Sequence, residues 1–221
     1  MKTAYAKTAK PRGRPRSFDR DAALERAMEA FWEHGFEATS INDLTTAMGI
    51  NPPSLYAAFG DKETLFMEAI ERYQQQRAEA LGRAFDEEPT ARGAIERLLV
   101  ETAGQLTRTG VPRGCMLVMS TANCSADSAH VQDALAQRRA TLKARLKARI
   151  DRAVDEGELA PGTDTAALTD FYSMVIQGMS LQARDGATRK SLLAAAEAAM
   201  RAWPADARRS RQNGRRRAAA R

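Results

Sequence analysis

One short segment holds the side chains best suited to contact a nucleic acid, and it reads TSINDLTTAMGINPPSLYAAFGDK from residue 39 to residue 62. In its second half, Leu55 and Phe59 are four residues apart and would share the inner face of a helix. The other residues of that helix would then point outward, where hydroxyl, phenol and methyl groups can meet base edges and phosphates. These outward residues are Pro53, Ser54, Tyr56 and Ala57.

A basic stretch precedes this segment. Residues 1–16 carry six basic side chains and no acidic one, and three of them are Arg12, Arg14 and Arg16. A glycine and a proline between these arginines keep the chain extended. Because arginines on an extended arm can enter a minor groove, we interpret residues 1–16 as a flexible basic arm that contacts DNA.

The far end of the chain is basic as well, with seven arginines and no acidic residue over 208–221. Subtracting the thirteen basic residues of the two ends from the total of 34 leaves 21 basic against 28 acidic residues elsewhere. An acidic centre with basic ends is typical of a protein that meets a polyanion. For the tail the simpler interpretation is a solvated, disordered segment that aids solubility.

Two helices and a tight turn would position the outward residues. Thr39 is a good N-cap, and apolar residues at helical spacing predict a helix that ends at Gly49, a residue type that tolerates the left-handed conformation. Asn51 can cap the next helix, and Pro52 suits its first position. The pattern predicts a helix-turn-helix unit, the kind of element that enters a DNA groove.

The rest of the chain also reads as helices, so we predict an all-α fold. The helix over 163–183 is apolar around much of its circumference, which indicates burial on several sides, including by a second copy of the chain. The other helices are predicted over 19–34, 62 to about 82, 90–108, 126–156 and 188–203, with a short apolar piece over 115–120.

Several classes of function lack the residues they need. No apolar run of about 18 residues and no secretion signal occurs, so we expect a cytoplasmic protein that does not contact membranes. The two cysteines favour an intracellular, reduced state. His34 and His130 belong to no ligand-spaced cluster, and we expect neither a metal nor a cofactor. Because phosphate loops, nucleophile elbows and HExxH motifs are also missing, we do not expect an enzyme.

These residues resemble the TetR/AcrR family of bacterial transcriptional repressors, most strongly in the stretches ALERAMEAFWEHGFEATSINDL and AMGINPPSLYAAFGDKETLF. The resemblance implies an all-helical homodimer whose helix-turn-helix units bind a palindromic operator, and a C-terminal part that responds to a small molecule. By family position, phosphate contacts would come from Thr39, Ser40, Tyr56 and Lys62. Pro53, Ser54 and Ala57 would face bases.

The resemblance also gives the domain plan. We expect a basic arm at 1–16, a helix-turn-helix DNA-binding domain at 17–62, a helical effector-binding and dimerisation domain at 63–204 and a basic disordered tail at 205–221. By family analogy the effector cavity would be bordered by Cys115, Met116, Met119, Cys124, Phe171, Tyr172, Met174 and Gln177.

Most of these candidate cavity residues have a second interpretation, which is plain packing in the core. The two cysteines admit either a reactive thiolate, with Arg113 lowering the pKa of Cys115, or a regulatory disulfide, or burial as small hydrophobic residues.

The function expected from the sequence is a ligand-responsive transcriptional repressor that is released from its operator by an unidentified small-molecule effector. The alternative is a nonspecific nucleic-acid or nucleoid-binding protein held by its basic ends, whose binding would be almost entirely counterion release.

Overall fold

The computed structural model describes residues 18–120 and 124–205, and for residues 79–81 the backbone alone. All regular structure in this part of the chain is helical, which confirms the all-α prediction. The helices are α1 (Arg20–His34), α2 (Ile41–Met48), α3 (Pro52–Phe59), α4 (Lys62–Asp86), α5 (Ala91–Leu106), α6 (Met116–Met119), the 3-10 turn η1 (Ala126–Ser128), α7 (Ala129–Asp155), α8 (Thr165–Arg184) and α9 (Arg189–Met200).

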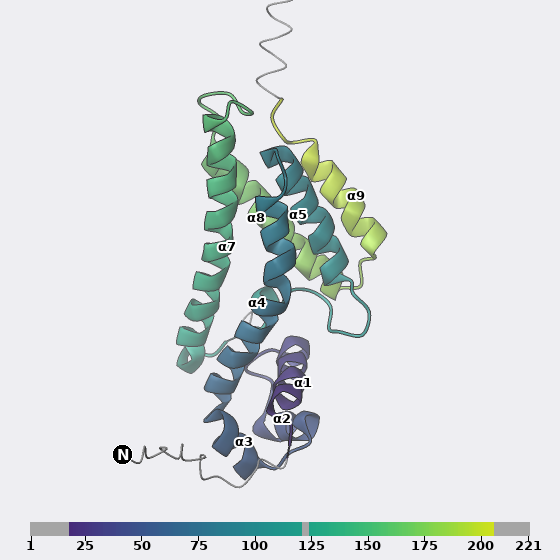
Figure 1. The fold of residues 1–221 in the computed structure, drawn as a ribbon. Coiled ribbons are helices and arrows are strands. Elements are labelled where there is room, and N and C mark those ends of the chain that lie inside the picture. Colours follow the sequence, from purple (N-terminus) through teal and green to yellow (C-terminus); the bar gives the residue numbers. More distant parts are fainter. Residues whose placement is uncertain (1–17, 121–123, 206–221) are drawn as a thin grey trace, which may run out of the picture.

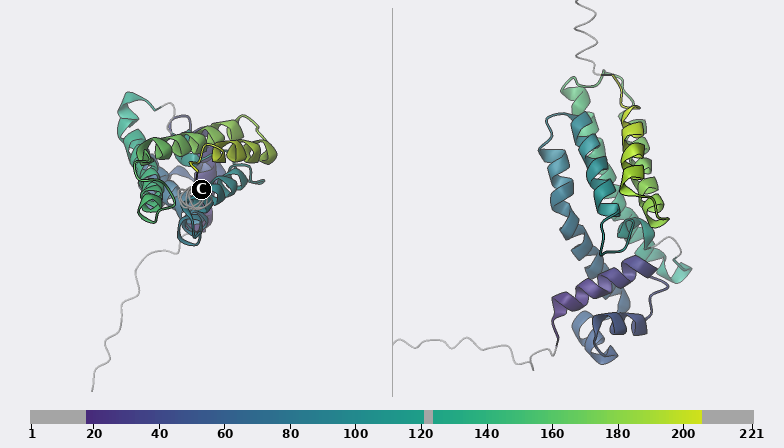
Figure 2. Two further views of the ribbon diagram at one scale, coloured as in Figure 1. Left: turned by 90° about the horizontal axis from the view of Figure 1, so that it is seen from above. Right: turned by 90° about the vertical axis from the view of Figure 1, so that its right-hand side faces the viewer.

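The molecule is elongated, with α1, α2 and α3 at one end and a bundle at the other (Figure 1). We call α1–α3 the head and α5–α9 the bundle. Helix α4 begins in the head and runs into the bundle, and α7 lies along the bundle and reaches down beside the lower part of α4 (Figure 1). The side view shows α1 between the bundle and the α2–α3 pair (Figure 2).

The ends of the helices follow local capping chemistry, with two corrections to the sequence prediction. The N-cap of α2 is Ser40 and not Thr39: the Ser40 hydroxyl accepts from the Asp43 amide at 3.1 Å, and the Asp43 carboxylate accepts from the Ser40 amide at 2.9 Å. The Thr39 hydroxyl instead donates to the carbonyl of Gly35 at 2.6 Å. Helix α4 also passes through Gly82 to Asp86, since that glycine does not take a positive φ.

Two clusters of buried apolar side chains hold the described residues together. The first belongs to the head, where Phe31 and Phe36 pack against Phe66 of α4 with ring centroids 5.0 Å and 4.9 Å apart. It does not stop at residue 62, because Leu65 to Tyr73 of α4, Met116 and Leu117 of α6, and Val131 and Leu135 of α7 are part of it. The second cluster fills the bundle between α5, α7, α8 and α9.

None of the helices in the described ranges combines the length and the apolar character needed to cross a bilayer.

Candidate DNA-binding face and effector cavity

The turn between α2 and α3 aims α3 outward. Gly49 takes a left-handed conformation with φ 68°, and its N–H donates to carbonyls of the last turn of α2. The Asn51 side chain then accepts from the amide of Ser54 at 2.9 Å, so α3 begins at Pro52 as the sequence predicts. Leu55 and Phe59 are buried. They dock α3 on the rest of the head and leave its opposite face open.

The predicted contact residues of α3 lie on that open face. Pro53 and Ala57 are exposed, Ser54 is half-buried, and Tyr56 is 50% exposed, which is unusual for a large aromatic side chain. A phenol, a hydroxyl and two small apolar groups on one short helix can offer hydrogen bonds and methyl contacts to a groove.

The predicted contacts outside α3 differ in accessibility. Thr39 is fully buried and its hydroxyl is already bonded to Gly35, so its side chain is not placed to reach a phosphate. Ser40 is exposed, and its hydroxyl donates to the Asp43 carboxylate at 2.6 Å. The hydrogen bond from Ser40 lowers the pKa of Asp43. Arg12, Arg14 and Arg16 lie outside the described residues.

Lys62 is half-buried at the start of α4. Its Nζ lies 4.5 Å from the centroid of the Phe36 ring and donates to the carbonyl of Glu37 at 3.4 Å. Burial lowers the pKa of this ammonium group. A phosphate contact by Lys62 would therefore compete with contacts that already tie α4 to the loop between α1 and α2.

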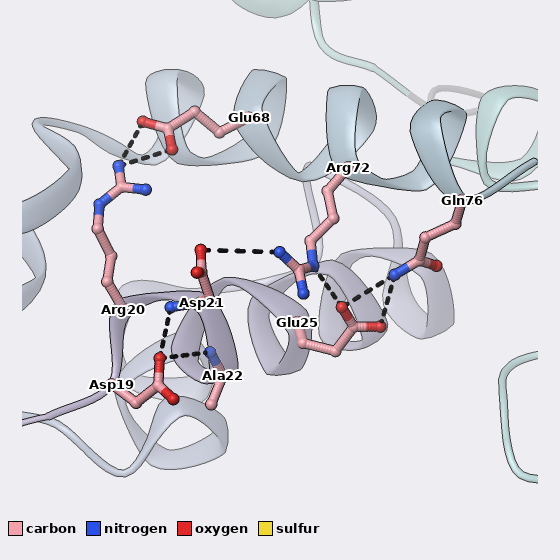
Figure 3. A network of polar contacts seen from close by, with 8 residues as sticks. All are labelled: Asp19, Arg20, Asp21, Ala22, Glu25, Glu68, Arg72 and Gln76. Carbon is pink, nitrogen blue, oxygen red and sulfur yellow. Dashed lines mark hydrogen bonds and ion pairs between the residues drawn. The ribbon is translucent and has the colours of Figure 1, made fainter. Parts of the chain in front are cut away.

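A network of charged residues between α1 and α4 orients the head (Figure 3). The Arg20 guanidinium donates to both carboxylate oxygens of Glu68, at 2.8 Å and 2.7 Å, and to the carbonyl of Ala58 in α3. Further along, Arg72 pairs with Glu25 and lies 3.8 Å from Asp21. Sequence reasoning missed this network. Its signal was that Asp21 and Glu25, and likewise Arg72 and Gln76, are four residues apart and so share a helix face.

The segment around α6 joins the head to α4 and the bundle. The Trp32 indole donates to the carbonyl of Gly114 at 3.1 Å, and the amide of Phe36 donates to the carbonyl of Ser120 at 3.0 Å. The amide of Met116 donates to the Tyr73 hydroxyl of α4 at 3.0 Å. The end of α1 is thereby held at both ends of α6.

The start of α7 touches the head at a second place. The amide and hydroxyl of Ser125 donate to the Glu37 carboxylate at 2.9 Å and 2.7 Å. Hydrogen bonds from Ser128 and Ser125 lower the pKa of Glu37 to about 2. His130 lies 2.7 Å from the Glu63 carboxylate of α4, and this contact raises the pKa of the imidazole. Movement of α7 would therefore reach the helix-turn-helix through the loop that precedes α2 and through the start of α4.

A cavity of about 440 Å³ lies between α4, α5, α6, α7 and α8. That volume falls in the range of small-molecule sites, roughly 300–1,000 Å³. Two of the predicted cavity residues line it, namely Cys115 and Gln177.

The other predicted cavity residues lie elsewhere. Met116 is buried in the first core cluster, and Tyr172 is buried in the second, where its hydroxyl donates to the carbonyl of Ala199 at 3.3 Å. Phe171 packs edge-on against Tyr172. Met174 is 65% exposed on α8. Met119 and Cys124 are not among the lining residues of the cavity. The Met119 side chain lies close to Gly114 instead.

The largest share of the cavity wall comes from α7, in a stretch rich in Arg, Lys and Gln from which no residue was predicted to border the cavity. Leu142 and Leu146 of this stretch form part of the apolar wall, and the intervening polar residues also border the cavity. A polar helix face that borders a cavity has the same sequence pattern as one that faces water, so helical periodicity could not separate the two.

The two cysteines are free and occupy different surroundings. The amide of Cys115 donates to the Ser180 hydroxyl at 2.8 Å, and its side chain lines the cavity. Arg113 donates to the carbonyl of Ala187. Burial raises the pKa of Cys124, which lies near Lys62 and Glu37 at the head. Within the described ranges no group of three or more potential ligand side chains is placed to hold a metal ion.

Comparison with known proteins places this arrangement among bacterial regulators. Residues 23–69 match the family model described as bacterial regulatory proteins, tetR family, and residues 93–199 match that of the tetracyclin repressor-like C-terminal domain. The HTH-type transcriptional repressor ComR of Escherichia coli (strain K12) is 38% identical over 196 residues, which cover 88% of this chain and 93% of that protein. The HTH-type transcriptional repressor BdcR of the same strain is 32% identical, and the aligned region covers 83% of this chain and 88% of that protein.

A solved structure with a similar fold contains DNA. A cysteine mutant of the TetR family transcriptional regulator CifR, complexed with 26-base-pair operator DNA, superposes with a TM-score of 0.83 at 44% identity. The match covers 86% of this chain and all of that one.

Proposed function

Because the chain belongs to the TetR family of bacterial transcriptional regulators, we propose that it is a ligand-responsive repressor. It binds a palindromic operator as a homodimer and is released when a small-molecule effector enters the cavity between α4, α5, α6, α7 and α8. The observation that carries the proposal is the outward face of α3, held by a buried inner face and joined to the cavity through α4, α6 and α7.

For the DNA contact, α3 enters the major groove with Pro53, Ser54 and Ala57 toward bases and Tyr56 and Ser40 toward phosphates. The arm contributes Arg12, Arg14 and Arg16 in the adjacent minor groove. The operator complex of the regulator CifR supports a DNA partner for this chain. Two heads of a dimer would stand about 34–36 Å apart, the spacing of successive major grooves on one face of the duplex.

The dimer contact is assigned to α8 and its neighbour α9. Met174 and Leu181 of α8 are seven residues apart, and both are exposed, at 65% and 49%. Gly178 lies between them with open space above it, and the partly buried Phe171 precedes them on the same helix face. An apolar stripe at this spacing fits a helix that packs on a partner helix. We name Phe171, Met174, Gly178 and Leu181 the α8 stripe.

Release requires only that the effector bind the DNA-incompetent conformation better than the competent one. A coupling of about 1–3 kcal/mol would lower operator affinity roughly 5- to 150-fold. The cavity wall includes Leu117 of α6 and residues of α4 and α7, and all three elements contact the head. An effector that shifts any of them would change the orientation of α3.

The test is fluorescence anisotropy with the full chain, using DNA from immediately upstream of its coding region and a scrambled duplex across a salt series. We expect a preference of about 10³ or more for the upstream fragment near physiological salt. Equal and steeply salt-dependent affinity for both duplexes would instead support nonspecific binding through the basic ends.

A further inference from the structure

We propose that the effector is an amphipathic organic anion, with a carboxylate group on a compact apolar body. This inference rests on the proposed function, because it assigns the effector to the cavity. Three observations support it: the cationic side chains around the cavity, the groups that these side chains already contact, and the apolar residues of the wall between them.

The charged side chains among the described residues of the cavity wall are all of one sign. None of the described lining residues is Asp or Glu, whereas five carry a positive charge: Arg77, Arg138, Arg139, Lys143 and Arg145. The chain without its two basic ends has more acidic than basic residues. The described charges at the cavity, all positive, therefore differ from the average of the molecule, and they would draw anions toward the cavity.

Two of the five cations already have a carboxylate partner. Lys143 lies 2.5 Å from the Asp170 carboxylate, and Arg138 lies 3.6 Å from that of Glu71. These two side chains are partly neutralised within the protein.

The other three cations are held by neutral groups. The Arg77 guanidinium lies 3.9 Å from the centroid of the Tyr73 ring and donates to the Gln105 side-chain oxygen at 3.2 Å. Arg139 donates to the carbonyl of Leu117 at 2.5 Å, and Arg145 lies 5.3 Å from the centroid of the Phe85 ring.

Arg77 and Arg139 are only partly exposed, so each keeps its charge in a restricted space. A planar guanidinium in that situation is suited to a carboxylate, which it can bind with two parallel hydrogen bonds.

The remainder of the wall suits an apolar body. Leu98, Leu106, Leu142, Leu146 and Ile176 line the cavity from three helices, α5, α7 and α8. Among them the Ser173 hydroxyl is buried without a hydrogen-bond partner, although it borders the cavity. A buried hydroxyl without a partner is costly, and a ligand oxygen would satisfy it.

The test uses matched compounds that share an apolar body and differ in charge. The full-length dimer would be titrated with 4-phenylbutyrate, hexanoate and 1-naphthylacetate, each beside its primary amide and the corresponding primary amine. Isothermal titration calorimetry gives the affinity, and anisotropy on the preferred DNA gives release. In at least one set we expect the acid to bind about tenfold or more tightly than the amide, with the amine weakest.

Substitutions then locate the anion. Arg139→Gln should weaken the bound acid about tenfold and leave the amide unchanged, since only the acid uses the charge. Arg77→Gln should act in the same way. Arg139 is the preferred position for the test, because Arg77 also packs on Trp32 and its replacement would change that packing as well. Arg152→Gln is the matched control, on the same helix as Arg139 but paired with Glu156 outside the cavity wall.

The proposal would be overturned if no acid binds, if the amides or amines bind as tightly as the acids, or if the arginine variants bind the acids normally. Release of operator DNA by a neutral compound would overturn the anion assignment and leave the repressor proposal intact. If the protein binds acids but shows no preference for the operator, the repressor proposal is overturned and the anion site in the cavity stands.

Discussion

Tyr56 presents its phenol on the outer face of α3 while the inner face of the same helix is fully buried. We expect Tyr56→Phe to weaken binding to operator and scrambled DNA by a similar factor, roughly three- to tenfold, because one hydrogen bond to a phosphate contributes about 1 kcal/mol. Fluorescence anisotropy with both duplexes measures this loss of affinity.

Tyr172→Phe is the matched control for that measurement. It removes a buried phenol that donates to Ala199 in the bundle, so it should lower stability by about 1 kcal/mol and leave DNA affinity unchanged. Wild-type affinity for Tyr56→Phe on both duplexes would take the phenol out of the DNA contact.

His130 and Glu63 give the junction of α7 and α4 a dependence on pH. The hydrogen bond that His130 donates to the Glu63 carboxylate raises the pKa of the imidazole above its ordinary value near 6.5, and nearby Asp133 acts in the same direction. A raised pKa means that the stabilisation is fully present below about pH 6.5 and is lost as the pH rises through the folded pKa.

Thermal unfolding of wild type and His130→Ala across pH 5.5 to 8.5 tests this pH dependence. The difference in Tm should be largest at the acidic end and should shrink toward zero at the basic end. A difference that is constant with pH, or that grows as the pH rises, would show that the ion pair does not contribute. Glu63→Gln should remove most of this pH dependence while leaving the histidine in place, since the contact with Glu63 is the largest of those that raise the pKa.

At the scale of helices, the turn between α2 and α3 depends on the backbone of Gly49. We expect Gly49→Ala to destabilise the protein by roughly 1–2 kcal/mol, because φ 68° is costly for any residue with a Cβ. Gly104→Ala, at an ordinary helical position in α5, is the same substitution and should stabilise by up to about 1 kcal/mol. Urea unfolding of both variants gives the sign of each change in the free energy of unfolding. Equal changes for the two variants would contradict this account.

The contact between Arg20 and Glu68 fixes the angle of α1 against α4. Because the pair is partly buried and also holds the Ala58 carbonyl of α3, we expect a coupling of roughly 1 kcal/mol in a double-mutant cycle of Arg20→Gln and Glu68→Gln. Urea unfolding of the four proteins measures it. Additive effects within error would mean that the pair does not determine the packing of the head.

Helix positions were predictable from the sequence because caps and apolar periodicity are local. Asp19, Asn51, Asp61 and Thr90 all act as N-caps near the predicted starts. Capping preference alone could not choose between Thr39 and Ser40, since both residue types are good N-caps and the Thr39 hydroxyl is buried and bonded to the carbonyl of Gly35.

The cavity was harder to predict, because its wall draws on five helices that are distant in sequence. Only Cys115 and Gln177 of eight predicted residues line it, and no residue of α7 was among the eight. The outward direction of α3 was predictable since one buried face defines the other. The contacts assigned to individual DNA-facing residues and the division of the chain at residue 62 stay predictions.

For the whole molecule, the α8 stripe predicts the state of assembly. Met174→Lys together with Leu181→Lys would place two charges in the proposed interface, and we expect a monomer with operator affinity lowered by at least about tenfold. Light scattering after size exclusion reports the mass. Val100→Lys changes another exposed apolar residue, on α5, and should leave the dimer intact. A dimeric double variant would move the interface away from this stripe.

The core of the head is completed by residues that lie beyond it in the chain. Leu65, Phe66, Ile70 and Tyr73 of α4 are buried against α1, and α6 adds Met116. A chimeric regulator joined at residue 62 would pair one protein's head with another protein's half of that core, and packed cores tolerate such mismatches poorly. Exchange of operator specificity between relatives, in the laboratory or by recombination, therefore needs a junction after Tyr73 and a matching α6.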